Sequence, residues 1–557
     1  MYGVEDHPRP AHALALGLQH ALLALVFLVY PLAAAQQIGL SVSDTQKFLV
    51  AVVLSIGAAT CLHGIRRPVG TGALAVEIPT PAFLPTAVLA GSTGGIAMLA
   101  GMSLVSGVVE LFFAGALRRI RSLFPAEVCG VAVMMLGLSL VRPGILNVFG
   151  TPGSEPAFAA TPLAVAAVTL ATIASIALFG SGRIKLLALG GGVLAGTSLS
   201  WVTGLAGSRH WAPLAASGWI GTPDLEIGTA ALKPELLPLC IVMALILAID
   251  NVGMLIGIQR QANPGWSRID VQQAGSGIRV SSIGDLIAGL LGGMPTGISS
   301  ANISLAHATG AVARRISFIT AALLVLAAFS PKAIKAVSMI PRPVVGAVMV
   351  YAAAYMLVSG MTLFLGRLLN ERRMFVVGLS IVVGLCPAVA PTLFTAVSPT
   401  LRPILESPLA LGSFCAILLT QLLRIGAAKK AELTVELPSS ENEMVHELSF
   451  NKAIRPTLLE LGASAGASRP AVYRAIDVSS EIVACLKVAG HIGHRVTVVA
   501  SFVDSRLQLT LGYDGDPPPA VDSSRPDDVL QRLYAQTDVM ARQRGANRSE
   551  LTVAFDS

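Results

Sequence analysis

Long apolar segments constrain this chain more than any other feature of its sequence. Fourteen of them lie between residues 12 and 424, and a helix needs about 20 apolar residues to cross the hydrocarbon core of a bilayer. Only 13% of the 557 residues are charged, whereas a soluble globular chain carries about 25%. The sequence therefore predicts an all-α polytopic membrane protein. The expected transmembrane segments are 12–34, 47–65, 81–95, 97–117, 127–148, 159–180, 183–204, 234–256, 276–293, 299–312, 315–330, 341–366, 373–391 and 404–424.

Basic residues are concentrated in every second loop between these segments. Arg66 and Arg67 follow the second segment, and Arg314 and Arg315 follow the tenth. Because cytoplasmic loops are enriched in Lys and Arg, we expect both termini in the cytoplasm and the protein in a bacterial inner membrane. The same loops account for the net charge of +7, so we expect membrane lipids rather than nucleic acid as its surroundings.

Seven segments on each side of the middle predict an inverted repeat, in which the two halves have opposite orientations. Two stretches rich in Pro and Gly, 78–86 and 292–300, open segments three and ten at matching places in the two halves. Such residues interrupt a helix and leave backbone groups unpaired, which lipid tolerates only beside a cavity or a ligand. We interpret the two stretches as broken helices that form a substrate site. Two ordinary loops between helices are the alternative.

Two acidic residues lie within apolar segments. Asp250 stands deep in segment eight, where a carboxylate is costly unless it faces a cavity or a partner. We expect it to bind the substrate or to carry a proton. Asp285 lies ten residues before Pro295 of the second broken stretch and can orient that stretch through its backbone amides. A structural role is the alternative for both acids, and His20 in the first segment can hydrogen-bond across to the broken stretches.

Several of these residues resemble the motifs of the nucleobase:cation symporter-2 family, also called the nucleobase–ascorbate transporters. Bacterial uracil, xanthine and urate permeases belong to that family, and the resemblance covers residues 12–425. Asp250 falls where the family has a substrate-binding Glu, and Asp285 matches an Asp of the ninth segment. The other matching positions are Gln19 and His20, Pro81 to Phe83, Asn302, Thr309 and Gly310.

The resemblance implies a core domain from segments 1–4 and 8–11, a gate domain from segments 5–7 and 12–14, and a homodimer that works by an elevator-like motion. It also implies roles for single residues. Asp250 and Asp285 would serve proton coupling or support the site. The implied substrate-binding residues are His20, Phe83, Asp250, Met254, Ser300, Ala301 and Asn302.

Several positions depart from the family pattern: Ala301 and Ser304 differ from the signature of segment ten, Asp250 is one methylene shorter than the family's Glu, and Met254 replaces a polar residue. Ala301 stands where family members use a carboxylate or an amide to bond the base, and alanine has no such group. Met254 lies one helical turn after Asp250, where relatives often have a polar residue. We therefore expect a pocket that is less polar than that of a typical uracil or xanthine permease.

The composition changes near residue 429. Residues 1–11 are polar, residues 12–428 form the expected transporter domain, and residues 429–557 are polar and charged. The tail alternates as soluble domains do, which predicts strands at 495–502, 507–511 and 551–555 and a helix at 471–489. This predicts a small cytoplasmic α+β domain, which resembles a degenerate ATPase domain of histidine kinases. A turn is expected at 514–519, and a folded tail without a ligand is the alternative.

The leading hypothesis is a secondary active transporter, not an enzyme, that takes up a nucleobase-like heterocycle by proton symport, with sodium as the other candidate ion. An anion transporter of the sulfate-permease type would share the fold, and a membrane sensor that signals through the tail is a further alternative. No P-loop motif supports an ATP-driven pump. The six cysteines form no CxxC pair, so we expect neither a disulfide framework nor a zinc site. We also expect no cofactor.

Overall fold

The computed structural model describes twelve stretches of the chain. They are residues 2–120, 125–150, 160–205, 214–263, 270–368, 370–423, 430–438, 442–465, 467–503, 506–514, 539–544 and 549–556. The turn expected at 514–519 lies outside these residues except for Asp514. The chain divides into two compact units. The first contains Met1–Pro125, Val131–Gly360 and Ser380–Cys415, and the second contains Ala126–Gly130, Met361–Leu379 and Ala416–Ser557.

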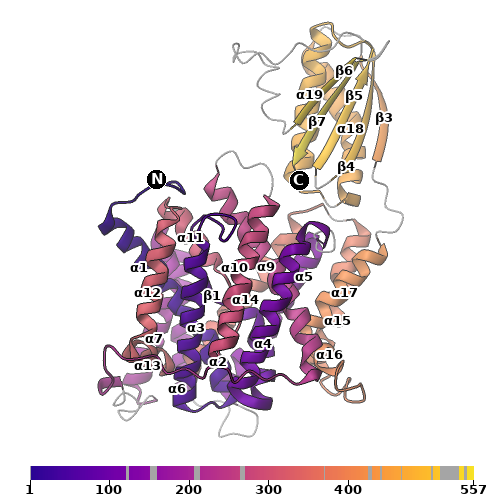
Figure 1. Ribbon diagram of the computed structural model, residues 1–557. Coiled ribbons are helices and arrows are strands. Elements are labelled where there is room, and N and C mark those ends of the chain that lie inside the picture. The colour runs from indigo at the N-terminus through magenta and orange to yellow at the C-terminus, as the bar shows by residue number, and fades with distance from the viewer. Residues whose placement is uncertain are drawn as a thin grey trace. The chain divides into compact units, whose positions relative to one another are not determined.

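Residues 10–423 are mostly helical (Figure 1). In the part of the chain that the structure describes, nine helices are long and apolar enough to cross a membrane, or ten if the bent pair α12 and α13 is one span. The helices are α1 (Pro10–Val26), α2 (Val29–Ile38), α3 (Val42–His63), α4 (Leu84–Ile120), α5 (Ala126–Phe149), α6 (Ala160–Phe179), α7 (Ala188–Val202), α9 (Leu237–Ala262), α10 (Val271–Leu291), α11 (Ser300–Thr309), α12 (Arg315–Ala328), α13 (Pro331–Ser338), α14 (Arg342–Leu365), α15 (Glu371–Val389), α16 (Arg402–Leu405) and α17 (Pro408–Leu423), with short 3-10 helices η1 (Pro81–Phe83), η3 (Gly182–Leu187) and η4 (Pro234–Leu236).

Each of the fourteen predicted segments contains at least part of a helix, but the boundaries differ from a simple series of crossings. Segments three and four are both parts of α4, which kinks at Gly94 and Gly95. Gly95 has φ 62° there, a left-handed conformation that glycine adopts without steric cost. Segment ten is only the ten residues of α11. The structure thus supports a multi-pass helical protein, while the count of fourteen crossings and the inverted repeat stay predictions.

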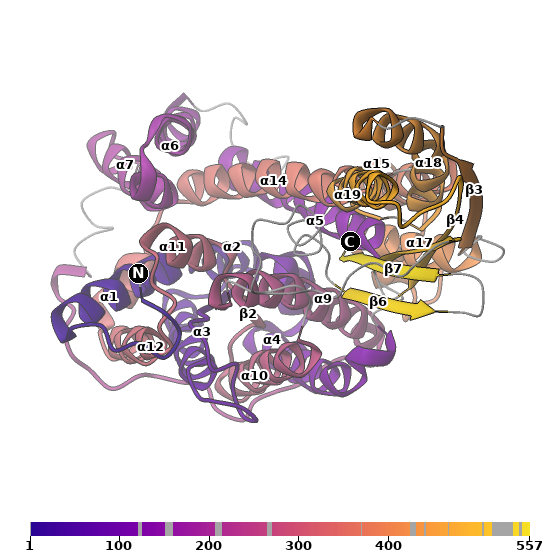
Figure 2. The same cartoon turned by 90° about the horizontal axis from the view of Figure 1, so that it is seen from above.

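The expectation of an all-α membrane domain misses a small sheet. The two broken stretches begin as extended strands, β1 (Glu77–Pro79) and β2 (Thr296–Ile298), which pair antiparallel with Ile78 opposite Gly297. β2 lies among α3, α9 and α10 (Figure 2). The pairing satisfies backbone groups that proline and glycine exclude from helices, and it brings together residues more than 200 positions apart.

The N-terminal residues are tied to the loop between α11 and α12. The Tyr2 N–H donates to Gly310 O at 2.8 Å, and the Arg314 N–H donates to Val4 O at 3.0 Å. The Glu5 carboxylate binds Arg66 at 2.7 Å and Arg314 at 3.2 Å. These hydrogen bonds, with Arg66 the larger contributor, lower the pKa of Glu5 to about 2. The polar start of the chain is therefore anchored to the first unit.

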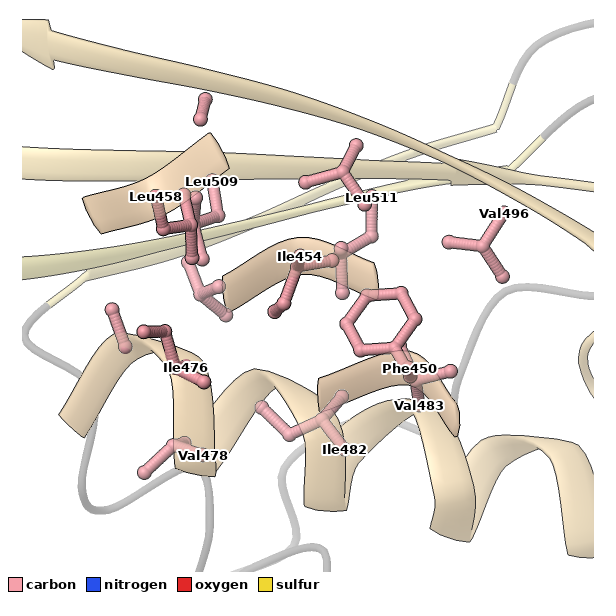
Figure 3. Close-up of a cluster of buried hydrophobic side chains, with 14 of the residues drawn as sticks. Phe450, Ile454, Leu458, Ile476, Val478, Ile482, Val483, Val496, Leu509 and Leu511 are labelled. Atoms are coloured by element: carbon pink, nitrogen blue, oxygen red, sulfur yellow. The ribbon is translucent and has the colours of Figure 1, made fainter. Parts of the chain in front are cut away.

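The second unit contains a five-stranded antiparallel sheet in the order β3-β4-β5-β7-β6. Helices α18 (Glu443–Ala465) and α19 (Arg469–Val488) bury their apolar faces against it, and Figure 3 shows Phe450 and Ile454 of α18 facing Leu511 of β5. Residues 507, 509, 511 and 513 of β5 are buried, which is the period of two expected of a strand. The strands are β3 (Lys430–Glu436), β4 (Arg495–Val503), β5 (Arg506–Tyr513), β6 (Val539–Arg544) and β7 (Ser549–Asp556).

The sequence patterns predicted four of these seven elements, namely α19, β4, β5 and β7. The strand β3 was missed because its seven residues carry three charges and only Val435 is buried, as is typical of an edge strand. The strand β6 reads Val-Met-Ala-Arg-Gln-Arg and shows no alternation. The helix α18 was missed although it is 23 residues long.

The second unit also includes the start of α15 and the start of α5. Arg373 of α15 forms an ion pair with Glu127 of α5 and donates to the Ser464 carbonyl of α18 at 3.2 Å. The Leu368 N–H donates to Ala467 O at 3.0 Å. Side-chain and backbone contacts therefore join α5, α15 and the helices of the sheet domain within this unit.

Candidate functional site

The paired strands place the starts of two helices side by side. Thr80 donates its N–H to Pro295 O at 3.3 Å, and Ser299 donates its N–H to Val76 O at 2.9 Å. Thr80 then caps η1, because its side chain accepts the Ala82 N–H, and Ser299 caps α11 by accepting the Asn302 N–H at 3.1 Å. Both helices therefore begin at the same place in the protein.

A close approach requires glycine at the centre of β2. A Cβ atom on Gly297 would lie 3.1 Å from Leu247 Cδ1 and 3.3 Å from Asn251 Oδ1. Asn251 Oδ1 accepts the Ile298 N–H at 3.0 Å. The strand is therefore held directly against α9, the helix that carries Asp250.

A cavity of about 380 Å³ opens in front of the two helix starts. This volume lies within the range of small-molecule sites, which is about 300–1,000 Å³. Thr80 and Pro81 contribute from the first broken stretch, and Ser300 and Ala301 from the second. The N–H groups of a first helical turn have no partner within the helix, and the positive end of the helix dipole lies there. The cavity wall is therefore suited to bind an electronegative atom.

Four of the predicted site residues line this cavity. They are Asp250, Met254, Ser300 and Ala301. The Asp250 side chain is half-buried, so its carboxylate faces the cavity rather than the packed interior. Met254 lies one turn further along α9 and adds apolar surface.

The other predicted residues lie behind the wall. Phe83 is fully buried and is not among the described residues that line the cavity. Asn302 and His20 are also buried, and His20 Nδ1 lies 2.7 Å from Asn302 Oδ1. Because Asn302 Nδ2 donates to Ser299 Oγ at 3.0 Å, its Oδ1 is the acceptor and His20 Nδ1 donates. Asp285 Oδ1 accepts the Thr296 N–H at 2.7 Å, so this carboxylate holds β2.

Several cavity residues were not predicted. The aromatic side chains among them are Phe27 between α1 and α2, Tyr30 of α2, and Tyr351 and Tyr355 of α14. Lys185 of η3 is a cation on the same wall, and the sequence pattern shows it only as one of the basic loop residues. Aromatic rings on apolar helices carry no signal of their own, because most such rings pack in cores.

The sequence interpretation also passed over further buried acids. Glu77 in β1 and Glu110 in α4 are fully buried. Glu110 lies within a predicted apolar segment, as Asp250 does, so the same rule could have singled it out. Among the residues that the structure describes, no group of three or more His, Cys, Asp or Glu side chains is placed to hold a metal ion.

A comparison with protein families shows to which family the chain belongs. The model of a family described as "Permease family" matches residues 11–393, which contain both broken stretches, Asp250 and the cavity. The chain belongs to this family. The permease is accordingly a multi-pass membrane transporter and not an enzyme.

Individual relatives of the permease are diverse in sequence but similar in extent. It is 25% identical to the xanthine permease XanP of Escherichia coli over 435 residues, which are 75% of this chain and 93% of that protein. It is 24% identical to the uric acid permease PucK of Bacillus subtilis, covering 75% of this chain and 97% of the relative.

A solved structure shares the fold of the permease. The murine Solute Carrier 26 family member A9 anion transporter, in its inward-facing state, aligns with a TM-score of 0.52 and 11% identity. The alignment covers 78% of this chain and 72% of that one. At this identity the similarity concerns the fold alone.

Proposed function

We propose that this permease is a secondary active transporter that takes up a nucleobase-like heterocycle of the xanthine, uracil or urate class. The observation that carries the proposal is the half-buried Asp250 carboxylate in a cavity formed where two helices begin. The size of the cavity suits one bicyclic heterocycle. The names of the relatives, which are xanthine and uric acid permeases, support the same substrate class.

The cavity offers hydrogen-bond acceptors, hydrogen-bond donors and flat aromatic surfaces to such a ring. The Asp250 carboxylate accepts hydrogen bonds from ring N–H groups, and hydrogen bonds to a charged acceptor are the stronger kind. The unpaired N–H groups at the start of α11 donate to a ring carbonyl. Tyr351 and Tyr355 provide flat surfaces for the ring faces, and Lys185 adds a positive charge that favours electron-rich oxygens.

Ala301 makes Asp250 the main polar anchor from a side chain. Family members of the resembled type use a second acid or amide at this position, and alanine leaves only its backbone N–H. Ser304 lies one turn further along α11 on the same cavity wall, but its hydroxyl donates to Ser300 O at 3.0 Å. It can therefore offer only an acceptor to the ligand.

The remaining parts of the proposal concern energy coupling and assembly. A proton is the coupling ion, with sodium as the alternative, and Asp250 binds the substrate in a way that depends on its protonation. The protein works in a bacterial inner membrane as a homodimer with an elevator-like motion. Both termini and the domain from residue 429 onward lie in the cytoplasm, and residues 12–428 carry the transport, with the core and gate domains that the family resemblance implies.

Uptake into membrane vesicles tests the proposal directly. Radiolabelled purines, pyrimidines and small anions are compared with and without an imposed pH gradient. We expect one heterocycle class to accumulate and the gradient to drive it. Accumulation of an anion without any heterocycle would sink the proposal and favour the anion-carrier alternative.

The matched variants are Asp250→Asn and Asp250→Glu. The first removes the charge at nearly constant shape, which costs about 1.5–3 kcal/mol of binding for a charge-assisted hydrogen bond. We expect coupled uptake to be abolished and substrate affinity to fall about 10- to 150-fold. The second keeps a carboxylate and should retain measurable uptake. Wild-type rates in Asp250→Asn would remove Asp250 from the mechanism.

A further inference from the structure

Three buried carboxyl groups lie behind the strand pair, and none of them is among the described residues that line the cavity. Glu77 belongs to β1, Glu110 to α4 and Asp285 to α10, and all three are fully buried. The helices α4, α9 and α10 and the strand β2 that surround them are neighbours in Figure 2. The buried histidine of this region is His63, at the end of α3.

Two of the carboxyl groups have partners on one oxygen only. Glu77 Oε1 accepts the Ser281 hydroxyl at 2.6 Å and lies 2.9 Å from His63 Nε2. Asp285 Oδ1 accepts from the N–H of Thr296 at 2.7 Å and from its hydroxyl at 3.3 Å. The second oxygen of each, Glu77 Oε2 and Asp285 Oδ2, makes no hydrogen bond, although the Ser106 hydroxyl lies beside Asp285.

Glu110 differs from both, because neither of its oxygens has a hydrogen bond. The Asn251 amide lies beside it, but the two groups do not meet hydrogen-bond geometry and Asn251 Nδ2 is also without a partner. Asp285 and Glu77 are the charged groups that act on Glu110. A buried polar group without a partner is rare in folded proteins, so an unpaired carboxyl group and an unpaired amide at one place indicate a missing ligand.

The charges identify what kind of ligand is missing. Of the three carboxyl groups, Glu77 is in contact with the buried His63 of α3, and α9 contributes the neutral Asn251 beside Glu110. A buried charge is costly unless it is paired. A metal ion would need several ligands around one point, and the described side chains form no such group. A proton needs a single oxygen, removes one negative charge and turns an acceptor into a donor.

We propose that Glu77, Glu110 and Asp285 form a proton-binding site of their own, separate from the substrate cavity, in which Glu110 is the principal carrier. On loading, one proton bonds to a carboxylate oxygen and produces a carboxylic acid. The new O–H then donates to a neighbouring carboxylate oxygen that lacks a donor. On release, the proton leaves to water and the carboxylate is restored.

The site is linked to the substrate cavity through the strands. Glu77 is a residue of β1, and Asp285 holds the Thr296 N–H at the start of β2. Asn251 holds the Ile298 N–H at the end of β2 and follows Asp250 in α9. Loss of the proton restores repulsion between the carboxylates, of which Glu77 is part of β1 and Asp285 is hydrogen-bonded to β2. The two strands lead into Thr80 and Ser300 on the cavity wall. Proton occupancy and substrate affinity are therefore coupled. This coupling rests on the proposed function, whereas the proton site does not.

Infrared spectroscopy of the full-length protein in lipid bilayers detects the proton itself. A buried carboxylic acid has a carbonyl stretch distinct from that of a carboxylate, and the band shifts in heavy water. We expect this band in the unsubstituted protein at neutral pH, without any substrate. It should lose intensity in Glu110→Gln, which is nearly isosteric, and persist in Asp250→Asn.

Three outcomes would overturn the proton site. One is the absence of the band from the unsubstituted protein, which needs no variant and so does not depend on whether Glu110→Gln folds. Another is a band of full intensity in both Glu110→Gln and Glu77→Gln. The third is that the unsubstituted protein lacks the band but is stabilised by sodium ions, and that Glu110→Gln abolishes this stabilisation. That result would identify the ligand as a monovalent cation.

The coupling is tested by substrate affinity as a function of pH. In the unsubstituted protein, one linked proton changes Kd by up to tenfold per pH unit. We expect the slope of log Kd against pH to be smaller in Glu110→Gln, by up to one. An unchanged slope together with a lost band would show that the proton on Glu110 is not linked to substrate binding, and it would overturn the coupling. If no heterocycle binds at all, the proposed function fails while the infrared result still decides the proton site.

Discussion

The hydrogen bond between His20 and Asn302 is expected to hold the start of α11 in place. His20 Nδ1 donates to Asn302 Oδ1 at 2.7 Å, and both side chains are almost inaccessible to solvent. Asn302 in turn binds Ser299 Oγ through its N–H and its Nδ2. His20→Phe keeps a ring of similar size and removes the donor, so it leaves a buried acceptor unsatisfied.

The cost follows from that buried acceptor. An unsatisfied buried polar group costs about 1–3 kcal/mol, so we expect the free energy of unfolding to fall by this amount in His20→Phe. Asn302→Leu removes the acceptor and should also destabilise. In the double variant no unsatisfied pair remains, so its loss should be smaller than the sum of the two single losses by about 0.5–3 kcal/mol, the usual range for residues in contact.

The assay is a denaturation titration with sodium dodecyl sulfate in mixed micelles, followed by circular dichroism. His307→Phe is the matched control, because His307 lies on α11 itself but is exposed, and it should change stability by no more than about 0.5 kcal/mol. Strict additivity of His20→Phe and Asn302→Leu would show that the two side chains do not interact, and it would refute the assigned support of α11.

Two further predictions concern helix packing and pH. A Cβ atom on Gly101 would lie 2.1 Å from Ala231 O, so Gly101→Ala should lower the free energy of unfolding by about 1–3 kcal/mol in the same titration. A Cβ atom on Gly253 meets open space, so Gly253→Ala should be neutral or stabilising. Equal losses in the two variants would contradict the packing argument. Burial raises the pKa of Asp270, but backbone N–H groups and Arg67 outweigh it and lower the pKa overall. The stabilising effect of the Asp270 carboxylate is therefore present at neutral pH and lost as the pH falls below the ordinary aspartate pKa of about 3.9. The difference in thermal stability between Asp270→Asn and the unsubstituted protein should vanish in acid. A difference that stays constant with pH would argue against this role of Asp270.

The membrane-spanning part was largely predictable because its signal is local. A run of apolar residues must form a helix in lipid, since no water is present to satisfy the backbone. The broken stretches were predictable for the same reason, because Pro81, Pro295 and their neighbours cannot continue a helix. Asp250 stood out because a carboxylate in such a helix requires a cavity or a partner.

The number of crossings was harder to predict. Gly94 and Gly95 join two predicted segments into one kinked helix, and whether a glycine pair ends a helix or bends it depends on what packs around it. In the second unit, β3 and β6 were missed because edge strands need not alternate, and only the paired register with β4 and β7 reveals them.

The sequence by itself determined the class of protein, the helical segments and the two interruptions, and it singled out Asp250 as a candidate site residue. Tertiary structure decided what surrounds that carboxylate. It paired β1 with β2 across more than 200 residues, brought Lys185 and Tyr351 onto the cavity wall, and placed Glu77, Glu110 and Asp285 together behind it. The physical reason is range. Helix formation in lipid depends on the backbone and on neighbouring residues. A site made from many separate helices and strands depends instead on which surfaces pack together, and no local pattern records that choice.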